Sequence, residues 1–218
     1  MQAQQQNGQS RREWVIILFL LLIMLVKGVM WSIAFPLWQG PDEEDHYNVI
    51  QFIAELGRLP GARDTFLVDE VALSRQLADV GRLPYAPEQR QAFSTTAIGP
   101  GEEALAALDP ALRTSFDMGM VGKLNKATPL YYVLAAIPYR LFPDGDLLAR
   151  AQIQRQFSLL MSVGIVIVAY LVSRNLFPHR RAMRLTIPIL VAFHPLMSQM
   201  TAVVTVDGFY FLIYSLLI

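Results

Sequence analysis

The sequence contains no cysteine. A disulfide framework, a zinc site built on thiolates and a cysteine nucleophile are therefore all excluded. Charged residues are also scarce, at 17% of the 218 residues, whereas 54% are hydrophobic. A chain this apolar is not typical of an ordinary soluble domain, and it indicates a membrane protein with a sizeable polar insertion.

Acidic residues are missing from one long stretch. Of the 18 in the chain, none lies between Leu147 and Val206, and 16 lie between Leu37 and Arg150. The acid-free stretch instead carries six arginines, which are Arg150, Arg155, Arg174, Arg180, Arg181 and Arg184. A separation of charge of this kind is a signal of membrane topology, so we expect no nucleic-acid partner.

The first long apolar run predicts a transmembrane helix over residues 14–36. About 20 apolar residues cover a hydrocarbon core of roughly 30 Å. Residues 1–13 are a polar tail in which the Gln-rich residues 1–10 are followed by Arg11 and Arg12. We predict that residues 1–10 are disordered, and that the tail is cytoplasmic because basic residues stay on that side. Lys27 interrupts the run, and we expect it to contact a neighbouring helix or a wet cavity.

Residues 37–127 are predicted to form a long extracytoplasmic loop with amphipathic helices. The loop begins with Asp42-Glu43-Glu44-Asp45-His46, where Asp42 is a candidate N-cap and the acids favour a helix start. The apolar pattern that follows predicts a helix that ends at Gly57 and lies along the membrane surface. Residues 66–80 and 102–116 also have helical patterns. A loop of this length suggests a functional role.

The remaining segments follow from the positive-inside rule. Residues 128–143 predict a short interfacial or re-entrant helix, because a crossing there would place the basic turn at 177–184 outside. The second and third transmembrane helices are then predicted at 156–176 and 185–204. Residues 209–218 predict the start of a fourth, so we expect the chain to be the N-terminal part of a larger all-α, polytopic membrane protein.

This topology places the acidic cluster, Lys126 and Asp207 on the outer face. Carboxylates beside a cation at a membrane surface suit group transfer from a lipid phosphate. One carboxylate would accept a proton from an incoming hydroxyl, and the cation would stabilise the leaving phosphate.

The order of these motifs resembles the GT-C superfamily of membrane glycosyltransferases, including bacterial relatives of protein O-mannosyltransferases and aminoarabinose transferases. The resemblance rests on three segments spread over residues 14–218. They are Pro41-Asp42-Glu43 with His46, Lys126-Ala127-Thr128-Pro129-Leu130-Tyr131-Tyr132, and Phe193-His194-Pro195 followed by Thr205-Val206-Asp207-Gly208. Thr128 departs from many relatives, which have proline or histidine there.

The resemblance implies a sugar donor linked to polyprenyl phosphate, an acceptor hydroxyl or amine, and a site that faces outward from the cell (inner) membrane. It assigns a catalytic acid to Asp42 or Glu43, a second acid to Asp207, and a contact with the lipid phosphate to Lys126. His46 and Tyr131 are further candidates for substrate binding. Some members use a divalent metal at the acids, but this sequence itself establishes no cofactor. By this resemblance the chain alone is expected to be inactive without the rest of the enzyme.

Each of these residues also has a structural interpretation. Asp42 and Asp207 are both candidates for helix caps, His46 for a hydrogen bond on a helix, and Lys126 for an ordinary interfacial lysine. Tyr131 and Tyr132 fit a belt of interfacial aromatic residues. Two other functions therefore stay open: a transporter subunit with a polar pathway through Lys27 and Asp207, and a non-catalytic scaffold whose outer loop binds a partner.

Overall fold

A computed structural model describes residues 2–61, 66–78, 100–118 and 129–217. The described part of the chain is mostly helical. The helices are α1 (Gln2–Ala34), α2 (Glu43–Leu56), α3 (Asp69–Leu77), α4 (Pro100–Ala106), η2 (Pro110–Arg113), α5 (Pro129–Arg140), α6 (Leu147–Leu176), α7 (Arg181–Ala192), α8 (Pro195–Met200) and α9 (Asp207–Leu216). Strands β1 (Phe66–Val68) and β2 (Phe116–Met118) form a two-stranded antiparallel sheet in which Phe66 pairs with Met118.

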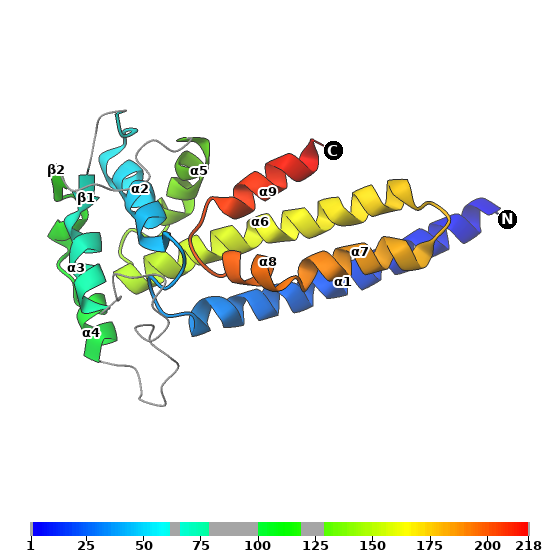
Figure 1. The fold of residues 1–218 in the computed structure, drawn as a ribbon, viewed down its shortest axis with the longest axis horizontal. Helices are drawn as coiled ribbons and strands as arrows, with labels where there is room; N and C mark the ends of the chain where they lie inside the picture. The colour runs from blue at the N-terminus through cyan, green and yellow to red at the C-terminus, as the bar shows by residue number, and fades with distance from the viewer. Residues whose placement is uncertain (1, 62–65, 79–99, 119–128, 218) are drawn as a thin grey trace.

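Two helices are long and apolar enough to cross a membrane. They cover Arg11–Ala34 of α1 and Leu147–Leu176, which is all of α6. The two helices lie side by side with opposite directions, and α7 runs back along both (Figure 1). Helix α1 begins at Gln2, so the prediction that the polar tail is disordered is wrong for most of its length. The smaller elements gather at the end of the bundle that lies away from the N-terminus (Figure 1).

The predicted third transmembrane helix is divided. Helix α7 has 12 residues and α8 has six, and the backbone between them is extended at His194, with φ −62° and ψ 124°. Pro195 explains the break, because its ring excludes the helical conformation from the preceding residue and it has no N–H to donate. Three full transmembrane helices are therefore not confirmed in the described residues.

Helix α2 is a core helix, so the prediction that it lies along the membrane surface is wrong. Nearly every residue from Glu43 to Ala54 is buried. The helix packs against α5, α3 and β1, and its polar side chains have partners inside the protein. Asn48, for example, donates to the Phe66 carbonyl and accepts from the Val68 N–H, which fixes β1 beside the helix. Strand β1 replaces the helical start predicted at residue 66.

The predicted end of this helix is confirmed. Gly57 adopts a left-handed conformation, with φ 67° and ψ 14°, and its N–H donates to the Ile53 carbonyl. This is the usual way in which glycine ends a helix, because it has no Cβ to strain.

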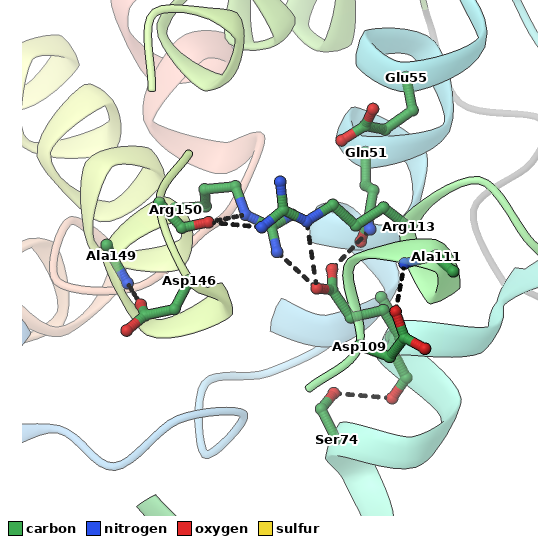
Figure 2. Close-up of polar contacts among 12 residues, drawn as sticks. Gln51, Glu55, Ser74, Asp109, Ala111, Arg113, Asp146, Ala149 and Arg150 are labelled. Atoms are coloured by element: carbon green, nitrogen blue, oxygen red, sulfur yellow. Dashed lines mark hydrogen bonds and ion pairs between the residues drawn. The ribbon is translucent and has the colours of Figure 1, made fainter. Parts of the chain in front are cut away.

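A buried polar network joins α2, α3, η2 and α6 at this end of the molecule. Glu70 is 1% exposed and accepts from Arg150 at 2.5 Å and from Gln51 at 2.6 Å. Arg113 lies 3.8 Å from the same carboxylate and also donates to the carbonyls of Pro143 and Gly145. Figure 2 shows the side chains of Arg150 and Arg113, which come from different segments and extend towards one another. The network connects the small elements to the start of α6.

Candidate functional site

Two loops that are far apart in the sequence meet at the same end of the bundle. The first connects α1 to α2 and contains Asp42, and the second leads into α9, which begins at Asp207. A Cβ added to Gly40 would lie 2.7 Å from the Cβ of Val203, so only glycine permits this close approach. The sequence therefore brings the predicted acids of the first and last motifs to one region of the structure.

Glu43 is the residue that joins these two loops. Its side chain is fully buried, and each carboxylate oxygen accepts two hydrogen bonds. Oε1 accepts from Arg155 Nε at 2.8 Å and from the Val204 N–H at 3.0 Å. Oε2 accepts from Arg155 Nη2 at 2.9 Å and from the Trp38 N–H at 3.1 Å. The carboxylate is thus saturated by donors from α6 and from both loops.

Arg155 completes this joint from the side of α6. It is 4% exposed, and Nη1 donates to the carbonyls of Ser32 and Phe35, both at 2.6 Å. Nη2 also donates to the Pro36 carbonyl at 3.1 Å. These carbonyls lie at the end of α1, where the helix leaves acceptors without partners of its own. One ion pair, which we call the Glu43–Arg155 pair, therefore holds α1, α2, α6 and the loop before α9.

Asp42 has a different environment from its neighbour. It is exposed and its backbone is left-handed, with φ 52° and ψ 21°. The Asp42 side chain makes no capping hydrogen bond to α2, so the cap interpretation is wrong for the side chain, although the Asp42 carbonyl accepts from the His46 N–H. Because Glu43 is buried and saturated, Asp42 is the better placed of the two predicted catalytic acids to reach a substrate.

His46 faces the same region from the first turn of α2. It is 6% exposed, and Nδ1 lies 2.9 Å from the hydroxyl of Tyr132 on α5. Burial lowers the pKa of His46 to about 4, against the opposing effects of the Asp207, Asp42 and Glu43 carboxylates. His46 is therefore neutral at physiological pH, with one ring nitrogen that donates and one that accepts.

Asp207 is half-buried at the first position of α9, and its N–H donates to Thr205 Oγ1. Its carboxylate also reaches the α5 tyrosines electrostatically. The pKa of Tyr132 is raised, first by burial and also by the Tyr131 and Tyr210 hydroxyls and by the Asp207 carboxylate. We refer to Asp42, His46, Tyr132 and Asp207 as the candidate site.

Tyr131 and Lys126, which were also predicted, are not part of this group. Tyr131 and Tyr132 are each 1% exposed, so the prediction of interfacial belt aromatics is wrong for both. The ring of Tyr131 packs against those of Phe157 and Phe209, with centroids 6.1 and 5.9 Å apart. Tyr131 therefore belongs to the core beneath the site. Lys126 lies outside the described residues.

The importance of Arg155 was not predicted. The sequence did contain a signal, because a charged residue in an otherwise apolar helix needs a partner. Lys27 follows the same rule, and its contact with a neighbouring helix was predicted. Its Nζ donates to the Ala192 carbonyl and to Ser198 Oγ, both at 2.7 Å, so it binds the backbone at the end of α7. The transporter hypothesis relied on Lys27, which in this structure has a structural role.

Within the described residues, no group of three histidine or carboxylate side chains is arranged to hold a metal ion. No family model matches the chain, and comparisons with curated proteins and with solved structures give no match either. The resemblance to the GT-C superfamily therefore stays a prediction from the sequence motifs.

The burial of His46 predicts a pH dependence of stability. The side chain titrates near 6.5 in the unfolded chain and near 4 in the folded protein. Between these two pH values the unfolded chain binds the proton but the folded protein does not. The contribution of His46 to the free energy of unfolding is therefore at its full value above pH 6.5, and it decreases as the pH falls towards 4. The loss is at most ~3 kcal/mol. We expect His46→Gln to reduce this slope in unfolding measurements from pH 4 to 7.

His179→Gln is the matched control, because His179 is exposed at the far end of α6. It should leave the slope as it is in the parent protein. An equal slope in the parent and in His46→Gln would show that His46 is not buried in its neutral form.

Proposed function

We propose that this chain is part of a membrane glycosyltransferase of the GT-C type. It would transfer a sugar from a polyprenyl-phosphate donor to an acceptor hydroxyl or amine at the end of the bundle that carries the candidate site. The two long apolar helices support a membrane location. The distribution of arginines supports a cytoplasmic N-terminus, and with that topology the candidate site would face the outer side.

One observation carries this proposal. Asp42 and Asp207 come from the first and last motifs of the sequence, yet the loops that precede α2 and α9 touch at Gly40 and Val203, and both carboxylates oppose the lowering of the pKa of the buried His46. A non-catalytic scaffold has no need for two carboxylates around a neutral histidine. Perturbed titratable groups that converge at a surface are typical of sites that bind or transform a substrate.

The proposed reaction is a displacement at the anomeric carbon of the sugar. The acceptor oxygen or nitrogen forms a bond to this carbon, and the bond from the carbon to the phosphate oxygen breaks. The electron pair leaves with the polyprenyl phosphate. Asp42 is exposed and takes the proton of the acceptor as general base. Asp207 holds the acceptor or the sugar by accepting hydrogen bonds.

His46 and Tyr132 form a fixed neutral pair beside the two acids, at 2.9 Å. Because the imidazole is neutral, it can orient a sugar hydroxyl without neutralising the Asp42 carboxylate that serves as base. Lys126 is the proposed contact of the leaving phosphate on the basis of the sequence resemblance alone.

The test uses the full-length protein in membranes with radiolabelled sugars on polyprenyl phosphate as donors. We expect Asp42→Asn and Asp207→Asn each to lower the transfer rate by about 10²–10⁴-fold, which is the usual contribution of general-base catalysis and of precise positioning. Both proteins should insert normally and unfold at the temperature of the parent.

Asp144→Asn is the matched control, because Asp144 is an exposed carboxylate in the turn between α5 and α6. It should retain full transfer. If both site variants also retain full transfer, the proposed mechanism is wrong.

A further inference from the structure

The opposite end of the bundle carries a concentration of positive charge. The first part of α1 and the turn from α6 to α7 lie at the same end of the bundle (Figure 1), and the sequence places six arginines in these two segments. We call this surface the basic end; its arginines are Arg11, Arg12, Arg174, Arg180, Arg181 and Arg184. Glu13 is the acid that lies among them, because the sequence has no other acid before Asp42 or between Asp146 and Asp207.

The Glu13 carboxylate has its interaction partners within the basic end itself. Its side chain is buried and lies 2.5 Å from Arg184 Nη2 and 3.7 Å from Arg181 Nε. It also accepts a hydrogen bond from the Tyr170 hydroxyl at 3.4 Å. The Arg184 side chain is correspondingly 13% exposed. One carboxylate therefore neutralises the inner arginine and leaves the outer ones uncompensated.

The uncompensated arginines point outward. Arg11, Arg12, Arg174 and Arg180 are all exposed, and within the described part of the chain none of them forms an ion pair. Arg181 is 45% exposed despite its distant contact with Glu13. The basic end thus presents a group of free guanidinium groups, which bind phosphate oxygens in a bidentate geometry better than lysines do.

The sides of the bundle next to these charges are apolar. Leu18 and Phe19 on α1 are 61% and 63% exposed, and Leu176 at the end of α6 is 66% exposed. A surface for nucleic acid or for an acidic protein does not need apolar side chains directly beside its cations. A lipid offers both chemistries in one molecule, because its phosphate lies directly above its acyl chains.

We propose that the basic end binds the headgroups of anionic phospholipids, with the acyl chains lying along the exposed apolar faces of α1 and α6. This inference rests on the proposed membrane insertion and does not depend on sugar transfer. In the proposed topology the basic end faces the cytoplasmic leaflet, whose anionic lipids attract arginines near the surface.

The experiment compares the association of spin-labelled phosphatidylglycerol and phosphatidylcholine with the protein in phosphatidylcholine vesicles. The fraction of each label that is motionally restricted gives the relative association constant. At low salt we expect phosphatidylglycerol to be favoured by about fivefold or more, and this preference should decrease in 1 M NaCl, where charges are screened. The double variant Arg174→Gln, Arg180→Gln should lower the preference at least ~threefold.

A matched control removes two arginines from the other end of the molecule. Arg58→Gln with Arg75→Gln changes the net charge by the same amount and should keep the preference. Equal restriction of the two lipids by the parent protein, or equal losses in both double variants, would overturn the lipid site while leaving membrane insertion intact. If neither lipid is restricted, the chain is not inserted, and that result overturns the proposed membrane location together with this inference.

Discussion

The substitution Glu43→Gln is expected to lower the free energy of unfolding by about 3–5 kcal/mol. Glutamine has nearly the same shape, but its single amide oxygen replaces only one of the two carboxylate oxygens, so it can accept from the Trp38 N–H or from the Val204 N–H and not from both. It has no charge, however, and its NH₂ group would face the guanidinium of Arg155, which is 4% exposed. The dominant cost is therefore an arginine that stays buried without its counter-ion.

The measurement is reversible unfolding of the protein in mixed micelles, followed by far-UV circular dichroism. Glu44→Gln is the matched control, since Glu44 lies one residue away and pairs with the partly exposed Arg75 at 3.3 Å. Water reaches Arg75, which is 38% exposed, and screens this pair, so the control should lose less than ~1 kcal/mol. Equal losses for the two variants would show that the Glu43–Arg155 pair is not buried as described.

A second large loss of stability is expected for Arg150→Met. Arg150 is fully buried and donates both to Glu70, at 2.5 Å, and to the Tyr139 hydroxyl. Methionine fills a similar volume but leaves the buried Glu70 carboxylate with Gln51 and a more distant Arg113. Removing one member of a buried pair costs about 3–5 kcal/mol, and we expect a value near the lower limit because these two partners remain.

Arg58→Met is the control for this prediction, because Arg58 is exposed and lies over the ring of Phe52, 4.7 Å from its centroid. It should cost less than ~1 kcal/mol. The double variant Arg150→Met, Glu70→Gln should recover part of the loss, since it removes the uncompensated charge. No recovery in the double variant would mean that Arg150 stabilises the protein through packing alone.

The sequence predicted those parts of the fold that depend on local pattern. The apolar runs in α1 and α6 and the glycine at the end of α2 are properties of neighbouring residues, and the structure has all three. The burial of α2 was not predictable in the same way. Its amphipathic pattern suits a membrane surface equally well, and it is buried only because β1, α3 and α5 cover it.

The candidate site was also predictable from the sequence only in part. Asp42, His46 and Asp207 were predicted from motifs, and the structure brings them to one region. The different environments of Asp42 and Glu43 were not predictable, since adjacent acids in a sequence differ only through what packs on them. Apart from the nearby Trp38 N–H, the donors that saturate Glu43 come from residues 112 and 161 positions later in the chain. No local pattern contains that information.

The sequence separation within the Glu43–Arg155 pair has a consequence for biosynthesis. At about 5–20 residues per second, the ribosome adds Arg155 roughly 5–20 s after Glu43. The Val204 N–H, which also binds Glu43, is made later still. During this interval the acidic segment that follows α1 has to remain hydrated, because its carboxylate has no guanidinium to accompany it into the protein. Assembly of the Glu43–Arg155 pair is therefore a late event, and a pause in translation before Arg155 would prolong the period in which this segment is open to proteases.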